Sequence, residues 1–206
     1  MGARNPEDVA AYDTLLAEVT VGEPQQLEGQ IEIRDYDPGW PRLYAREEER
    51  IRGILGERVI RMEHAGSTSV PGLPAKPLID IVLEVPDSSD EPAYAADLEA
   101  AGYPLRIREP DWFEHRVFKG PDTNVNLHVF SAGCGETDRM LLLRDWLRAN
   151  ESDRELYAAA KRELAARDWT YVQQYADAKT AVVSEILGRA EGARAERGGF
   201  DAGDAG

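Results

Sequence analysis

The 206-residue chain contains a single cysteine, Cys134. One cysteine cannot form a disulfide within the chain, and it cannot supply a cysteine-based zinc cluster, so the sequence indicates a reducing compartment. The glycines around Cys134 in SAGCGETD could expose its thiol, but no base stands beside it in the sequence to generate a thiolate. A nucleophilic cysteine is therefore not the favoured interpretation.

Long apolar runs are also missing. The sequence has no uninterrupted apolar segment long enough to span a membrane, and its N-terminus has no basic region followed by an apolar one. These absences argue against a transmembrane helix and against a secretory signal peptide. We expect a soluble cytoplasmic protein without a membrane partner.

Basic residues are outnumbered by acidic ones. The chain has 24 Lys and Arg against 39 Asp and Glu, which gives a formal net charge of −15. Broad binding to duplex DNA, to RNA or to anionic lipid requires cations that neutralise phosphates. The composition argues against these partners and leaves room for a local basic pocket.

What is present is typical of an ordinary globular protein, with 42% hydrophobic and 31% charged residues. The length favours one main domain, which we place at residues 29–190. Residues 6–19 have a helical pattern followed by polar residues, so residues 1–28 are interpreted as an N-terminal helix and linker. Residues 191–206 are rich in glycine, alanine and charge without a pattern, and we expect them to be disordered.

Strand and helix patterns alternate in the main domain. The strongest strand pattern is LIDIVLEV, residues 78–85, a continuous apolar run typical of a strand covered on both faces. Residues 112–120 and 124–130 predict a hairpin closed at PDT. Further strands are predicted at 31–37 and 58–66, and helices at 41–55, 94–103, 136–150, 152–167 and 169–190. The fold class is therefore α/β (α+β), a mixed sheet with flanking helices and a helical C-terminal half.

One stretch between two predicted strands carries most of the chemistry, EHAGSTSVPGLPAKPLID at residues 63–80. Its glycine–serine turn directly follows the first strand, where backbone N–H groups and hydroxyls can bind an anion. Its prolines and second glycine fit a rigid connector equally well, and both interpretations stay open. The candidate anion-binding residues of the turn are Gly66, Ser67, Thr68 and Ser69.

The same stretch ends in a candidate metal ligand, Asp80, at the start of the 78–85 strand. A catalytic Mg²⁺ site uses two oxygen anions close together. Because strand side chains alternate, the partner position on the same face is residue 82, which is Val82. A second carboxylate is therefore missing where it would be expected.

Several basic side chains could bind the same anionic ligand as the glycine–serine turn. Lys76 precedes the strand that carries Asp80, where it could neutralise a triphosphate or pair with a surface acid. Arg144 and Arg148 share one face of a predicted helix, and Lys161 follows on the next. A solvated, salt-bridged helix surface is the simpler interpretation of these three, and an anion-binding patch is the alternative.

Five motifs follow one another along the chain: YDPGWPRLY (36–44), EHAGSTSVPGLPAKPLIDI (63–81), LHVF (127–130), LRDWLR (143–148) and YAAAKRELA (157–165). Their order resembles that of the GrpB family, whose members are stand-alone bacterial or archaeal domains or C-terminal fusions to dephospho-CoA kinase. The similarity extends from about Ile31 to Leu187. The resemblance implies the fold of the nucleotidyltransferase superfamily.

The superfamily pattern assigns Gly66 and Ser67 to nucleotide phosphates and Asp80 to Mg²⁺. Active nucleotidyltransferases carry a second metal acid two residues later and a third carboxylate on a later strand. This sequence has Val82 and His128 at those places, and both departures argue against a two-metal mechanism.

Glu63, Glu84 or Asp145 could replace the missing metal ligand. His64 and His128 should approach the Asp80 strand if the resemblance holds, where they could bind metal or act as a general base. His115, between apolar residues on a predicted strand, is interpreted as a hydrogen-bonded structural histidine.

These observations lead to two hypotheses of different classes. In the first, an enzyme binds a nucleoside triphosphate or other phosphorylated small molecule with Mg²⁺, and transfers a nucleotidyl group to a small acceptor with Asp80 and His128 as catalytic residues. In the second, the same scaffold is a non-catalytic ligand-binding or accessory domain, linked to CoA metabolism or to protein folding. A metal-dependent phosphohydrolase is a third, weaker hypothesis.

Overall fold

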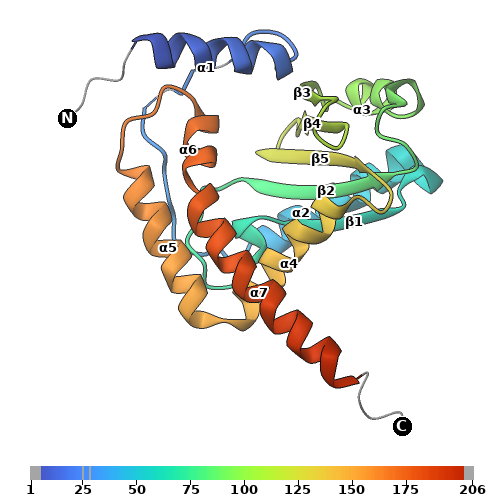
Figure 1. The fold of residues 1–206 in the computed structure, drawn as a ribbon. Helices are drawn as coiled ribbons and strands as arrows, with labels where there is room; N and C mark the ends of the chain where they lie inside the picture. The colour runs from blue at the N-terminus through green and yellow to red at the C-terminus, as the bar shows by residue number, and fades with distance from the viewer. Residues whose placement is uncertain (1–5, 25, 28, 202–206) are drawn as a thin grey trace. The chain divides into compact units, whose positions relative to one another are not determined.

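The computed structural model describes residues 6–24, 26–27 and 29–201. The chain divides into two compact units, each built from separate segments, and we describe each by itself. Unit 1 consists of residues 1–26, 39–64 and 78–134, and unit 2 of residues 27–38, 65–77 and 135–206. Figure 1 follows the elements along the chain.

A five-stranded mixed sheet, with strand order β1-β2-β5-β4-β3, forms the framework of unit 1. β2 and β5 are parallel, and β5, β4 and β3 are antiparallel. β2 is buried except at Asp80, as its continuous apolar run predicts. The strand bounds are β1 Arg61–Ala65, β2 Ile79–Val85, β3 Leu105–Glu109, β4 His115–Lys119 and β5 Val125–Ser131.

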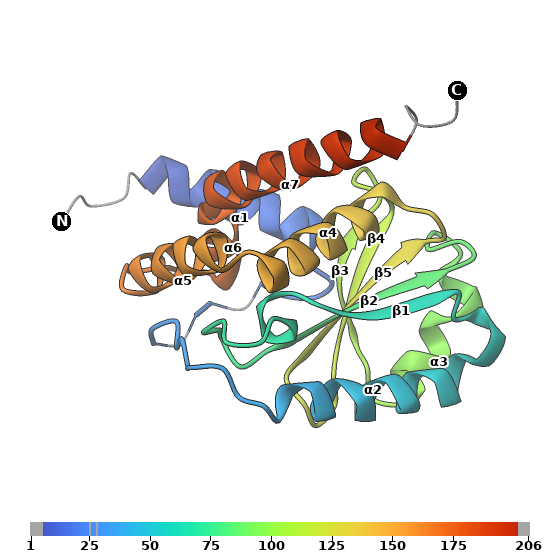
Figure 2. The ribbon, with the colours of Figure 1, turned by 90° about the horizontal axis from the view of Figure 1, so that it is seen from below.

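Three α-helices belong to unit 1: α1 (Pro6–Val19), α2 (Trp40–Leu55) and α3 (Ala95–Ala100). α2 lies along the sheet and contacts β2 and α3 (Figure 2). It is amphipathic, with Ile51 and Leu55 buried among apolar side chains, and it ends at Gly56, whose φ of 57° suits glycine. α1 contacts β3, so the N-terminal helix is part of unit 1.

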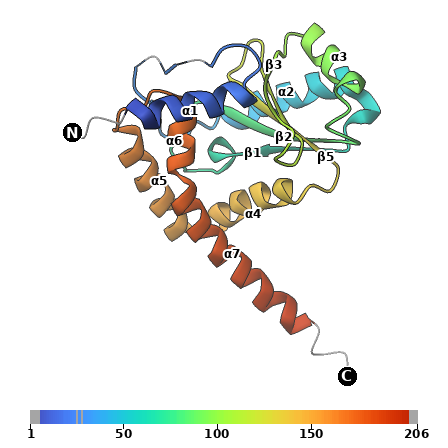
Figure 3. The same ribbon diagram turned by 45° about the horizontal axis from the view of Figure 1, so that its top comes forward.

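Unit 2 is helical, with α4 (Gly135–Ala149), α5 (Glu151–Ala165), α6 (Val172–Ala178) and α7 (Thr180–Asp201). α7 contacts α4, α5 and α6, and Figure 3 shows it crossing α4. One core cluster of this unit contains residues from α4, α5, α7 and the 65–77 segment: Val70, Leu73, Leu147, Tyr157, Ala158 and Ile186.

The mixed α/β class, the strand at 78–85 and the hairpin of β4 and β5 are confirmed. The strand predicted at residues 31–37 is wrong, because this segment forms a single bridge, between Arg34 and Ala75. β3 was not predicted. The helix predicted at 169–190 is divided into α6 and α7.

The predicted disordered tail also differs from the structure. Residues 191–201 continue α7, because glutamate, alanine and arginine favour helix despite the glycines between them. Residues 202–206 lie outside the described residues.

Candidate functional site

Polar side chains from four adjacent strands lie on one face of the unit 1 sheet. In parallel β2 and β5, Asp80 is paired with Asn126 and Val82 with His128, and paired residues share a face. On β4, Lys119 is paired with Asn126 and Val117 with His128. On β3, Glu109 is paired with His115 of β4. We call this set the polar row: Glu109, His115, Lys119, Asn126, His128 and Asp80.

One half of the polar row is centred on the carboxylate of Asp80. Its Oδ1 accepts a hydrogen bond from Asn126 Nδ2 at 3.1 Å and lies 3.5 Å from His128 Nε2. Lys119 Nζ donates to Asn126 Oδ1, which orients the amide so that its nitrogen faces Asp80. Both Asp80 and His128 remain partly exposed, with side-chain exposures of 23% and 19%. Both side chains are therefore in contact with solvent.

The other half of the polar row consists of two histidines and a glutamate. His115 Nδ1 lies 2.7 Å from Glu109 Oε2, and His115 Nε2 lies 3.0 Å from His128 Nδ1. Burial lowers the pKa of His115 to about 4, although the Glu109 carboxylate opposes the shift. The prediction that His115 is a hydrogen-bonded histidine is confirmed, and its partners are Glu109 and His128.

An aromatic turn, residues 110–114, joins β3 to β4 beside this half of the row. Trp112 and Phe113 are large side chains that remain 42% and 51% exposed. Trp112 packs against His115 with the two rings nearly perpendicular and 5.0 Å between their centroids. Phe113 and Glu114 both have positive φ, 54° and 50°, which L-residues rarely adopt. Such strain is concentrated at functional sites in proteins.

The residues predicted from β1 lie on its two faces. His64 stacks on Tyr44 of α2, with 4.9 Å between centroids and 5° between planes. Because neighbouring strand residues alternate, Glu63 faces the opposite side of β1 from His64. These two residues cannot both point toward one metal ion on one face of the sheet.

The predicted anion turn belongs to unit 2. Gly66 has a φ of 64°, and Ser67–Ser69 form a 3₁₀ turn in which Thr68 and Ser69 are buried. Ser69 Oγ donates to Gly66 O at 2.6 Å, so this hydroxyl closes the turn. The Ser69 carbonyl accepts from Arg148 Nη2 at 2.9 Å.

The basic residues predicted to bind an anion differ in burial and in their contacts within unit 2. Arg144 donates to Asp145 Oδ1 at 2.7 Å, and this contact holds the pKa of the Asp145 carboxyl below its usual range. Lys76 lies half-buried in the same 65–77 segment as the anion turn. Lys161, interpreted from the sequence as part of a solvated helix surface, is 2% exposed, so that interpretation is wrong for this residue.

Lys161 is buried because the 65–77 segment packs on α5. Its Nζ donates to the carbonyl of Pro74 and lies 4.8 Å from the centroid of the Tyr157 ring. The sequence pattern of α5 could not reveal a contact with a carbonyl 87 residues away.

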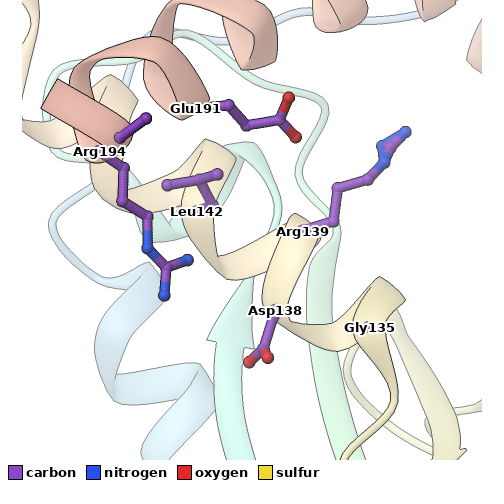
Figure 4. Close-up of a pocket in the computed structure, with 7 residues that line it drawn as sticks. Gly135, Asp138, Arg139, Leu142, Glu191 and Arg194 are labelled. Carbon is purple, nitrogen blue, oxygen red and sulfur yellow. The ribbon is translucent and has the colours of Figure 1, made fainter. Parts of the chain in front are cut away.

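A separate cavity of about 470 Å³ lies between α4 and α7 of unit 2 (Figure 4). Its charged lining combines acids and arginines, and the residues predicted from the sequence to form the site do not line it. The lining residues are Gly135, Asp138, Arg139, Leu142, Glu191, Arg194 and Ala195.

The side chains of the polar row can be compared with the ligands that a metal ion requires. Within residues 6–24, 26–27 and 29–201, no group of three or more His, Cys, Asp or Glu side chains is arranged to hold a metal. Asp80 and His128 supply two donor atoms at 3.5 Å. Mg²⁺ is commonly held by one or two carboxylates together with water and substrate phosphates, so Asp80 fits such a partial site.

No described helix is long and apolar enough to cross a bilayer.

Comparison with known proteins assigns a family. The sequence model described as "GrpB protein" matches residues 30–189. A UPF0157 protein of Halalkalibacterium halodurans is 62% identical over 178 residues, 86% of this chain and 91% of that protein. A dephospho-CoA kinase of Mycolicibacterium paratuberculosis is 30% identical over 157 residues, 64% of this chain and 39% of that protein.

A solved structure agrees with the sequence comparison. The crystal structure of conserved protein GrpB from Enterococcus faecalis is 27% identical, with a TM-score of 0.69 over 77% of this chain and 96% of that one. The match to the family model covers more than half of the chain, and the predicted resemblance is confirmed. The chain belongs to the GrpB family.

Proposed function

We propose that this protein binds a nucleoside triphosphate with a divalent cation at the Asp80 end of the polar row and transfers a nucleotidyl group to a small acceptor. The observation that carries the proposal is the 3.5 Å separation of Asp80 Oδ1 and His128 Nε2 on adjacent strands, with both side chains partly exposed. The proposal assigns metal binding to the carboxylate and proton acceptance to the neighbouring imidazole, the two roles that transfer to a hydroxyl requires.

Each residue has a distinct role in this proposal. Asp80 holds the cation, which supplies charge neutralisation at the phosphates. Asn126 keeps the carboxylate in place through its hydrogen bond. His128 takes the proton of the acceptor hydroxyl.

The proposal is for a site with one metal-binding carboxylate. Val82 occupies the position of the second acid, and its register partner on β5 is His128. An imidazole therefore lies beside the place where the superfamily pattern has a carboxylate.

Calorimetric titration tests the proposal. The full chain is titrated with ATP, CTP and GTP, each with Mg²⁺, with Mn²⁺ and without metal. We expect metal-dependent binding that Asp80→Ala abolishes and that Asp111→Ala leaves unchanged, since Asp111 is an exposed acid of the same unit. Absence of nucleotide binding, or full binding by Asp80→Ala, would overturn the proposal.

The second candidate is a non-catalytic domain that binds CoA or a precursor of it. It is favoured by Val82 in place of an acid and by the relatives named dephospho-CoA kinase. The same titration separates the two, because this candidate requires binding of CoA or dephospho-CoA without metal. Metal-independent CoA binding together with absent nucleotide binding would select it.

A further inference from the structure

We infer that Glu109 and His115 are positioning residues that hold His128 in the tautomer whose Nε2 carries an unprotonated lone pair beside Asp80. The inference rests on the proposed function for the use of that lone pair, as acceptor of the substrate's hydroxyl proton. The tautomer itself is a property of the protein without ligand.

The argument begins at the buried end of the polar row. An ionised carboxylate accepts hydrogen bonds and donates none, so the 2.7 Å contact with Glu109 Oε2 requires a proton on His115 Nδ1. His115 is 4% exposed, with Phe130 stacked on its ring at 4.6 Å between centroids and Trp112 packed nearly perpendicular to it. An apolar enclosure disfavours the charged imidazolium, and the neutral ring then has a bare Nε2.

The contact between His115 and His128 determines where the proton of His128 lies. His115 Nε2 lies 3.0 Å from His128 Nδ1, and a bare Nε2 can only accept. His128 Nδ1 must therefore carry the proton, which leaves the lone pair of a neutral His128 on Nε2. Glu109 thus determines, through two hydrogen bonds, which nitrogen of His128 faces Asp80.

The result is a pair of acceptors directed at one place. His128 Nε2 and Asp80 Oδ1 lie 3.5 Å apart, and two lone pairs at that distance repel unless a donor or a cation joins them. A hydroxyl placed there would give its proton to Nε2 while its oxygen bonds the α-phosphorus of the nucleotide and pyrophosphate leaves. The O–H bond and the bond to pyrophosphate break, and an N–H bond and a new O–P bond form. The imidazolium that results is stabilised by the Asp80 carboxylate.

The usual preference of histidine makes the inference specific. A neutral imidazole exposed to water favours a proton on Nε2, which is the opposite of the form required at His128. Glu109 and His115 are therefore necessary for this tautomer, and removing the acceptor at residue 109 should reverse it.

Nitrogen NMR reads the tautomers directly. Long-range proton–nitrogen spectra of the ¹⁵N-labelled full chain resolve both ring nitrogens of the three histidines, with His64→Gln and His128→Gln for assignment. We expect Nδ1–H forms of His115 and His128 at neutral pH. A wild-type His128 that carries its proton on Nε2 would overturn the inference.

Two substitutions at one position separate orientation from charge. Glu109→Ala removes the acceptor, and we expect His128 to change toward the Nε2–H form. Glu109→Gln removes the charge but keeps an oxygen acceptor, and we expect it to preserve the wild-type tautomers. Asp111→Asn, on the neighbouring turn, is the matched control and should change nothing.

Backbone amide shifts check the fold of each variant. A folded Glu109→Ala protein with unchanged His128 nitrogens would contradict the inference. Absence of nucleotide binding in calorimetry would overturn the proposed function, and the tautomers would still decide this inference by themselves.

Discussion

Arg148 of α4 holds the carbonyl oxygen of Ser69 with two nitrogens, Nε at 3.1 Å and Nη2 at 2.9 Å. A bidentate contact from a planar guanidinium fixes both the position and the direction of the carbonyl. Within unit 2, the 65–77 segment is therefore fastened by a helix rather than by a strand ladder.

Arg148→Ala should loosen this segment. We expect a loss of about 1–3 kcal/mol in the free energy of unfolding, because a charge-assisted contact is removed and the partly buried carbonyl of Ser69 loses two donors. Hydrogen exchange at residues 67–73 should accelerate. Arg162→Ala, which removes an exposed guanidinium, should change the free energy by less than about 0.5 kcal/mol. Equal effects of the two variants would refute the prediction.

Lys161 should make stability depend on alkaline pH. Burial lowers its pKa from 10.5 in the unfolded chain to about 7 in the fold. Between about pH 7 and about pH 9.5 the unfolded state binds the proton and the folded state does not, so stability rises with pH at up to about 1.4 kcal/mol per unit. Denaturant titrations across this range should show the rise, and Lys161→Met should flatten it. A parallel slope in both proteins would contradict this assignment.

His115 should make the free energy of unfolding depend on pH in the acidic range. Its pKa is about 4 in the fold, against 6.5 for an ordinary histidine. As pH falls from about 6.5 toward 4, the unfolded chain takes up a proton that the fold excludes, so stability declines by up to roughly 3 kcal/mol. Urea midpoints measured at several pH values should decrease accordingly. His115→Gln should remove most of that decline, and an unchanged dependence would show that other groups cause it.

Asp153 joins three helices of unit 2. Its carboxylate accepts from Trp146 Nε1 of α4 at 2.6 Å and from Arg189 Nη2 of α7 at 2.7 Å. Asp153→Ala leaves a partly buried indole N–H and a guanidinium without this partner, so we expect a loss of about 2–4 kcal/mol. Guanidinium titration followed by tryptophan fluorescence measures it. Glu155→Ala, an exposed acid on the same helix, is the control and should have little effect.

The sequence predicted elements whose signal is local. The run at 78–85 identifies a covered strand, and the apolar spacing of α2 identifies an amphipathic helix. β3 was missed because LRIRE is short and has arginine at alternate positions. The 31–37 segment alternates like a strand, but alternation does not supply a neighbouring strand to pair with.

The site residues likewise divide into those with a local sequence signal and those that depend on the pairing of strands. Asp80 was found because it interrupts an apolar strand, and His128 because the family pattern has a functional residue there. The contact of His115 with His128 depends on the register of β4 against β5, which places Val117 opposite His128. Glu109 lies on the strand that was missed, so its role was outside the reach of the sequence argument.

The two left-handed residues of the aromatic turn have a consequence for the stability of the fold. A non-glycine residue in that conformation costs of order 1 kcal/mol, so Phe113 and Glu114 lower the stability of the fold. Glycine at both positions would relax the turn, but it would also free Trp112 to leave the ring of His115. The conformational cost at Phe113 and Glu114 therefore accompanies the contact between Trp112 and His115, so stability and the ordering of this histidine oppose each other at the turn.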